Sequence, residues 1–402
     1  MADHRAGALL IALLAAVTTA CGGGTTATPQ PAPASPTAQP AATAKATTPI
    51  PATSARLENV LFAVLEPGAE SQPNTTVAIT GIDGLARAKA TFAPRALPRI
   101  GNAFPFTQLE AHTAAGAVYF MDGSGAVRRL SPDGANQPVT SFPITQPQQL
   151  AAFAVSPDGR RLAASVLTLP PRLAEPQPFG GWPAGARASV LIEVASAGGQ
   201  AQTIQTLDLG PIETAKLDET GLTIAGWDGG GPVALNFSLR GTQQGYNGYR
   251  ALGVRSHLDE ATGKPTGPPL GGPGCVSWGE AANGTVGCGV YAGQAFSIRA
   301  ADGTVLYEFT AEAGNFIYPA LSPDGSRTAV FQTGNDINRT TIQSKQGGKR
   351  LSVGFQPEGW LDADTLIGHN PGGNLAYLRL ATPDRVEDLG FKGTFAGIVK
   401  AG

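Results

Sequence analysis

Residues 315–332 read NFIYPALSPDGSRTAVFQ, a pattern that predicts a strand, a tight turn and a second strand. In the turn, Pro323 presets φ at the first corner, Asp324 caps its own backbone and Gly325 supplies a positive φ. The same arrangement recurs at residues 156–159, where SPDG joins LAAFAV to RLAASVL. Two copies of one hairpin indicate a repeat fold.

The spacing of the turn decides which repeat fold is expected. Weaker copies end at Gly116, Gly221, Gly284 and Thr365. Together with the strong copies at Gly159 and Gly325, they give intervals of 43, 62, 63, 41 and 40 residues. The two long intervals contain insertions, one at residues 170–187 and one within residues 240–272. A period of about 40 to 45 residues with four strands is typical of a β-propeller blade.

The rest of the globular part, residues 56–402, fits an all-β fold of seven four-stranded blades. It lacks sustained helical periodicity, and short apolar runs alternate with Gly, Asp, Asn and Pro. The first repeat offers three strands, and a spare strand at residues 394–399 follows the last complete blade. We expect that strand to close the first blade, which leaves no sheet edge open in the ring.

The N-terminus predicts export. Residues 1–20 have a short charged start, an apolar run and small residues before Cys21, as in a secretory signal peptide. The apolar run is shorter than the roughly 20 residues that cross a bilayer. The segment resembles a bacterial lipoprotein signal, although Thr18 stands where such signals usually have leucine. The resemblance implies lipidation of Cys21 and anchoring to the outer face of the cell membrane. The alternative is an ordinary secretory signal.

Residues 21–55 predict a disordered linker. Seven prolines, many Thr and Ala residues and the single charge of Lys45 leave nothing with which to form a core.

The strong turns, LSPDG and VSPDG, are each followed by a small apolar strand, SRTAVFQ or RRLAASV. These units resemble the WD-like repeats of TolB-type bacterial propellers, and the resemblance covers about residues 56–400. It implies a binding or scaffold role in the cell envelope. It identifies no catalytic residues, because such repeats occur in enzymes and non-enzymes alike.

Cys275 and Cys288 flank the hairpin turn of one predicted blade. In an exported protein a disulfide is favoured, and it would contribute roughly 3 kcal/mol. The alternative is two buried free cysteines.

No catalytic residues, metal site or cofactor are predicted. The histidines are scattered, at His4, His112, His257 and His369, and no metal-ligand spacing or nucleophile motif accompanies them. The net charge of -2 and the absence of a basic stripe argue against nucleic acid as a partner.

The competing hypothesis is a propeller enzyme, such as a lyase or a sugar dehydrogenase with a quinone cofactor. It would need His, Glu or Arg residues converging on the central channel.

The two insertions are the predicted binding surface. The first carries Phe179, Trp182 and Arg187, and the second carries Tyr246, Tyr249 and Arg250. Aromatic residues in long irregular loops either fold back on the blade or contact a partner. If both insertions join second to third strands, they emerge on the same face. We therefore expect a monomeric, membrane-anchored propeller that binds an envelope protein, a polymer or a small ligand.

The other tryptophans are expected in the core, with Trp278 and Trp360 on first strands and Trp227 ending a second strand.

Overall fold

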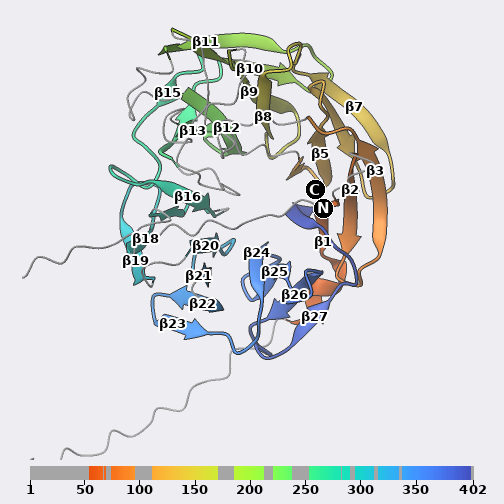
Figure 1. Cartoon of the computed structure of the whole chain (residues 1–402), viewed down its shortest axis with the longest axis vertical. Helices are drawn as coiled ribbons and strands as arrows, with labels where there is room; N and C mark the ends of the chain where they lie inside the picture. Colours follow the sequence, from red (N-terminus) through yellow and green to blue (C-terminus); the bar gives the residue numbers. More distant parts are fainter. Residues whose placement is uncertain are drawn as a thin grey trace, which may run out of the picture. The chain divides into compact units, whose positions relative to one another are not determined.

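The structure is a computed structural model that describes residues 54–66, 68, 74–95, 111–170, 185–211, 221–237, 253–281, 283–289, 295–311, 316–334 and 337–399. These residues form seven antiparallel four-stranded sheets, the blades of a propeller (Figure 1). A 3₁₀ helix, Ser54–Asn59, precedes the first strand. No helix in the described ranges has the length and apolar character that crossing a bilayer requires.

We number the blades in chain order and give the strands of each from one edge to the other. Blade 1 contains β28 (Thr394–Val399), β1 (Leu61–Glu66), β2 (Thr75–Gly81) and β3 (Ala86–Phe92). Blade 2 contains β4 (Ala111–Ala114), β5 (Ala117–Met121), β6 (Ala126–Leu130) and β7 (Asn136–Ser141). Blade 3 contains β8 (Gln149–Val155), β9 (Arg161–Thr168), β10 (Arg187–Ser196) and β11 (Gln202–Pro211). Blade 4 contains β12 (Gly221–Asp228), β13 (Gly231–Phe237), β14 (Arg255–Leu258) and β15 (Pro265–Thr266).

The other three blades follow the same order. Blade 5 contains β16 (Ser277–Glu280), β17 (Val286–Cys288), β18 (Ala295–Arg299) and β19 (Val305–Thr310). Blade 6 contains β20 (Phe316–Leu321), β21 (Arg327–Gly334), β22 (Ile337–Ser344) and β23 (Gly347–Arg350). Blade 7 contains β24 (Gln356–Trp360), β25 (Thr365–His369), β26 (Leu375–Arg379) and β27 (Val386–Asp388).

The ring closes as predicted. The C-terminal strand β28 pairs antiparallel with β1, from Leu61 opposite Val399 to Leu65 opposite Thr394. It also contacts β4 of blade 2 and β24 of blade 7, so it occupies the position of a first strand in blade 1. Blades 4 and 5 are joined by backbone hydrogen bonds between Gly253 and Ser277.

The hydrophobic core lies between the blades. Each of seven buried clusters combines side chains from two consecutive blades, with blade 7 packing against blade 1. Except in blade 5, the second strand contributes to the clusters on both sides of its blade. In β9, for example, Ala163 and Leu167 face blade 4, whereas Leu162, Ala164 and Val166 face blade 2. This double burial explains why second strands are nearly continuously apolar.

The turn from Ser322 to Gly325 also docks blade 6 on blade 5. Asp324 accepts hydrogen bonds from the Ser322 hydroxyl (2.7 Å) and the Ser326 amide (3.1 Å), as a turn cap does. Gly325 has a φ of +69°, and a Cβ at this position would lie 2.6 Å from the Thr285 hydroxyl of blade 5. The Asn283 side-chain amide of blade 5 donates to the Asp324 carbonyl (2.7 Å). Glycine is therefore required both by the turn and by the contact between blades.

We expect Gly325→Ala to cost about 1–2 kcal/mol more stability than Gly134→Ala, because only Gly325 is packed against a neighbouring blade. Gly134 ends the SPDG turn between β6 and β7, and it has a φ of +89° with no atom within 4 Å of its added Cβ. Both substitutions carry the strain of a positive φ, so their difference isolates the contact. The urea unfolding midpoints of the two variants measure this difference in stability. Equal losses would show that the turn conformation alone matters.

Two details differ from the sequence-based prediction. Trp227 ends the first strand of blade 4, not the second, because the turn that follows it contains Gly229, Gly230 and Gly231 and replaces the one expected at Gly221. From the sequence, the run RLSVGF at residues 350–355 predicts the fourth strand of blade 6, but this strand forms at Gly347–Arg350. The apolar residues after it, among them Leu351 and Phe355, pack into the core between blades 6 and 7.

Candidate functional site

The antiparallel order gives each blade two ends. The turns between first and second strands and between third and fourth strands lie at one end, which we call the hairpin face. The connections between second and third strands, and those leading to the next blade, lie at the other end, which we call the connection face.

Both insertions begin and end on the connection face. Residues 169–186 join β9 to β10 in blade 3, and residues 238–254 join β13 to β14 in blade 4. Each is a link between second and third strands, and the two blades are consecutive. Both insertions therefore join second to third strands, which is the condition that the sequence analysis set for their emergence on one face. The aromatic and charged residues predicted to contact a partner, Phe179, Trp182, Tyr246, Tyr249 and Arg250, lie outside the described residues.

Arg187 is the one member of the predicted surface that the structure describes. It begins β10, at the root of the first insertion, and its side chain is exposed. Its Nη2 lies 2.7 Å from the Asp208 Oδ2 on β11. The hydrogen bond from Arg187 lowers the pKa of Asp208, with a further contribution from the Gly210 amide. The positive charge at this point of the surface is thus compensated.

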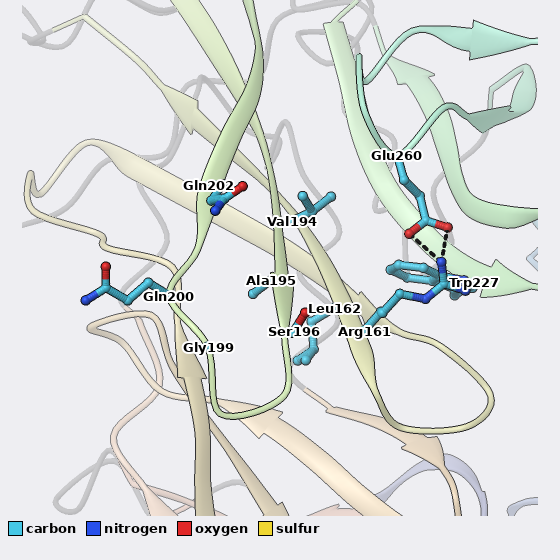
Figure 2. A pocket seen from close by; sticks show the side chains of 10 residues that line it. All are labelled: Arg161, Leu162, Val194, Ala195, Ser196, Gly199, Gln200, Gln202, Trp227 and Glu260. Atoms are coloured by element: carbon cyan, nitrogen blue, oxygen red, sulfur yellow. Dashed lines mark hydrogen bonds and ion pairs between the residues drawn. The ribbon is translucent and has the colours of Figure 1, made fainter.

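A groove of about 300 Å³ lies on the hairpin face between blades 3 and 4 (Figure 2). One side is the turn between β10 and β11, with Ser196, Gly199 and Gln200. The other side carries Trp227, near the end of β12, and Glu260, in the turn between β14 and β15. This groove was not predicted from the sequence.

An ion pair joins the two blades across the groove. Arg161 Nη1 lies 2.6 Å from Oε1 and 2.7 Å from Oε2 of Glu260. The Arg161 guanidinium carbon lies 5.3 Å from the centre of the Trp227 ring, within the range of a cation–π contact. Figure 2 shows the guanidinium over the Trp227 ring, with dashed lines to the Glu260 carboxylate. About half of the Arg161 side chain (52%) and a third of that of Glu260 (33%) remain accessible to solvent.

A second polar cluster lies where the ring closes. Glu358 on β24 accepts a hydrogen bond from the Phe395 amide on β28 (2.7 Å). Its other carboxylate oxygen lies 3.0 Å from His369 Nε2 on β25. The hydrogen bond to Glu358 raises the pKa of His369, although burial opposes the shift. When protonated, His369 supports a carboxylate that ties blade 7 to the closing strand.

This cluster makes stability depend on pH near neutrality. Because the folded state raises the pKa of His369, the added stability is fully present below about pH 6.5 and is lost as the pH rises through the folded-state pKa. His369→Gln should remove this part of the pH dependence, so the difference in melting temperature between wild type and variant should shrink from pH 6 to pH 8. A difference that stays constant over this range would contradict the assignment.

The other described histidines are held in structural contacts. The ring of His112 packs edge-on against Phe153, with 4.9 Å between the ring centres, and burial lowers the pKa of His112 to about 4. His257 Nε2 lies 2.8 Å from Asp228 Oδ1 within blade 4. Within the described ranges, no group of three or more His, Cys, Asp or Glu side chains is placed to hold a metal ion.

The predicted disulfide is present. Cys275 and Cys288 are bonded, and both side chains are buried between blades 4 and 5. Cys288 ends β17, whereas Cys275 lies just before β16 and not within it. Cys21 lies outside the described residues, so its lipidation stays a prediction.

The residues of the groove escaped prediction for a physical reason. Arg161 and Glu260 are 99 residues apart, and Trp227 was interpreted as a core residue. The signal was the blade register: Arg161 follows the strong turn of blade 3, and Glu260 lies in a hairpin turn of the next blade. Because the first turn of blade 4 was misplaced, this adjacency could not be seen.

Comparisons with known proteins show likeness at the level of structure only. No protein-family model and no curated protein matches the sequence. The chain is similar to the dihydro-heme d1 dehydrogenase NirN, at 15% identity and a TM-score of 0.42, over 87% of this chain and 76% of that one. TolB from Acinetobacter baumannii matches at 14% identity and a TM-score of 0.35, over 84% of this chain and 64% of that one. A functionally unknown protein from Desulfotomaculum acetoxidans matches at 13% identity and a TM-score of 0.46, over 84% and 98% of the two chains.

Proposed function

We propose that the protein is a lipid-anchored, extracytoplasmic β-propeller that binds an envelope protein or polymer through its connection face. One observation carries the proposal: the two long insertions are second-to-third strand links of consecutive blades, so they begin and end side by side on one face. Binding residues concentrate in such loops, because a rigid scaffold positions them.

Export is supported by two independent features. The segment before Cys21 resembles a lipoprotein signal. The Cys275–Cys288 disulfide belongs to the described fold, and disulfides persist in oxidising compartments outside the cytoplasm.

The first strand in the chain begins on the hairpin face. Leu61 at the start of β1 pairs with Val399 at the end of β28, and both lie at that end of the strands. The described residues that flank the two insertions lie at the opposite end of the strands from the start of β1.

The direct test places a photo-reactive amino acid at position 182 or 249, one in each insertion, in cells that produce the protein. We expect discrete crosslinked products, either with an envelope protein or with a polymer that is released by glycan-degrading enzymes. The matched control carries the same amino acid at Lys345, an exposed residue in a turn of the hairpin face of blade 6. The proposal is wrong if positions 182 and 249 give no product, or only the products seen at 345.

Lipidation has its own test. Cys21→Ala should move the protein from the membrane fraction to the soluble exported fraction, because a lipid chain supplies the membrane affinity. Cell fractionation with immunoblotting measures this change, and Cys275→Ala/Cys288→Ala serves as a control that leaves Cys21 in place. Unchanged membrane retention of the Cys21→Ala protein would rule out the lipid anchor.

A further inference from the structure

We propose that the groove between blades 3 and 4 on the hairpin face binds a neutral, hydroxyl-rich saccharide. The groove lies at the opposite end of the strands from the insertions. The proposal therefore stands or falls independently of the binding surface on the connection face.

Charge compensation within the groove argues for a neutral ligand. The Arg161 guanidinium and the Glu260 carboxylate are paired at 2.6 and 2.7 Å. An anion that binds the remaining donors of Arg161 would also face the Glu260 carboxylate, and a cation that binds Glu260 would also face Arg161, so neither charge gains a net attraction there. Both ions also keep unused hydrogen-bonding capacity, because the contacts with Glu260 engage Nη1 alone and a guanidinium carries five N–H donors. Both are partly exposed, so this capacity is accessible from the groove.

The remaining polar groups suit hydroxyl partners. Gln200 and Gln202 are exposed and line one side of the groove together with the Ser196 hydroxyl. Each glutamine amide offers both donors and an acceptor, and a hydroxyl is likewise donor and acceptor at once. A sugar, whose hydroxyls also act in both roles, satisfies such a set more fully than a ligand that only donates or only accepts.

Apolar surface lies next to these groups. Val194 and Trp227 are partly buried and pack against the core between blades 3 and 4. Both also line the groove. Sugar rings present C–H faces between their hydroxyl edges, so the alternation of apolar and polar lining fits their chemistry. The volume of about 300 Å³ is at the lower end of the range for small-ligand sites, roughly 300–1,000 Å³, which points to one or two sugar units and not to a protein domain.

The test is calorimetric titration of the purified protein with cellobiose and with cellobiouronic acid, a matched pair that differs by a carboxylate. We expect cellobiose to bind and cellobiouronic acid to bind about tenfold more weakly. Gln202→Ala should weaken cellobiose binding about tenfold, the effect of one lost hydrogen-bonding group. The control is Gln137→Ala, which removes the same exposed side chain near the start of a fourth strand, β7 in blade 2, and should leave binding unchanged.

Glu260→Gln separates a ligand site from a purely structural ion pair. It leaves Arg161 without its counter-charge, so the ratio of affinities should shift by about tenfold or more toward cellobiouronic acid. A purely structural role predicts a lower melting temperature with no change in this ratio. The proposal is overturned if wild type binds neither sugar, if Gln202→Ala and Gln137→Ala bind alike, or if Glu260→Gln leaves the ratio unchanged.

Discussion

A chain that ends at Gly393 should fail to fold into a stable monomer. The truncation removes β28, which pairs with β1 along its length and contacts β4 and β24 on either side. Its Phe395 packs against Phe62, with 6.3 Å between the ring centres, and its Val399 is part of the core between blades 1 and 2. The change therefore opens the ring at the junction of blade 7 with blades 1 and 2.

The expected result is a loss of the cooperative unfolding transition and aggregation through the exposed edge of β1. Such an edge presents unpaired backbone N–H and C=O groups that recruit other strands. Size-exclusion chromatography and thermal denaturation measure the outcome. A chain that ends at Val399 is the control, since it keeps β28 and lacks only residues 400–402.

A peptide covering residues 394–402 sharpens the test. Added in trans, it should restore part of the monomeric fraction, because the missing strand contributes both backbone pairing and buried side chains. If the truncated protein is monomeric and melts at the wild-type temperature, ring closure by β28 is not essential to the fold.

The fold could be predicted because its information is local and periodic. A turn such as Ser322 to Gly325 specifies one hairpin, and its recurrence specifies a blade. The errors arose where two local signals competed. In blade 4 the residues ending at Gly221 and the glycines at 229–231 both resemble turns in the sequence. Gly221 instead begins β12, whose Leu222 and Ile224 pack between blades 3 and 4. The spacing of the turns alone carries no information about such packing between blades.

The two candidate surfaces differ in how far the sequence could indicate them. The insertions interrupt the period, so residues such as Trp182 and Arg187 could be singled out directly. The groove depends on which side chains of consecutive blades meet, and Arg161 and Glu260 meet only after the register of both blades is set. A contact across 99 residues between two polar side chains leaves no periodic trace in a single sequence.

Removing the disulfide should have the second largest effect on stability. Blade 5 has short inner strands: β16 has four residues and β17 has three. Few backbone hydrogen bonds therefore hold it, and the Cys275–Cys288 bond spans the same two segments. Both cysteines are buried beside Val233 of blade 4, so the bond also lies in the core that joins the two blades.

Cys275→Ala/Cys288→Ala should lower the free energy of unfolding by about 3 kcal/mol, the value expected for a loop of this size. Urea unfolding with and without dithiothreitol measures it. Reduction should bring the wild-type midpoint down toward that of the double variant, whereas the variant should not respond to the reductant. Because the loss comes from a looser unfolded chain and from the core between blades 4 and 5, it should appear as one cooperative transition at lower urea. Separate melting of blade 5 would show instead that the disulfide stabilises this blade alone and that the ring does not unfold as a unit.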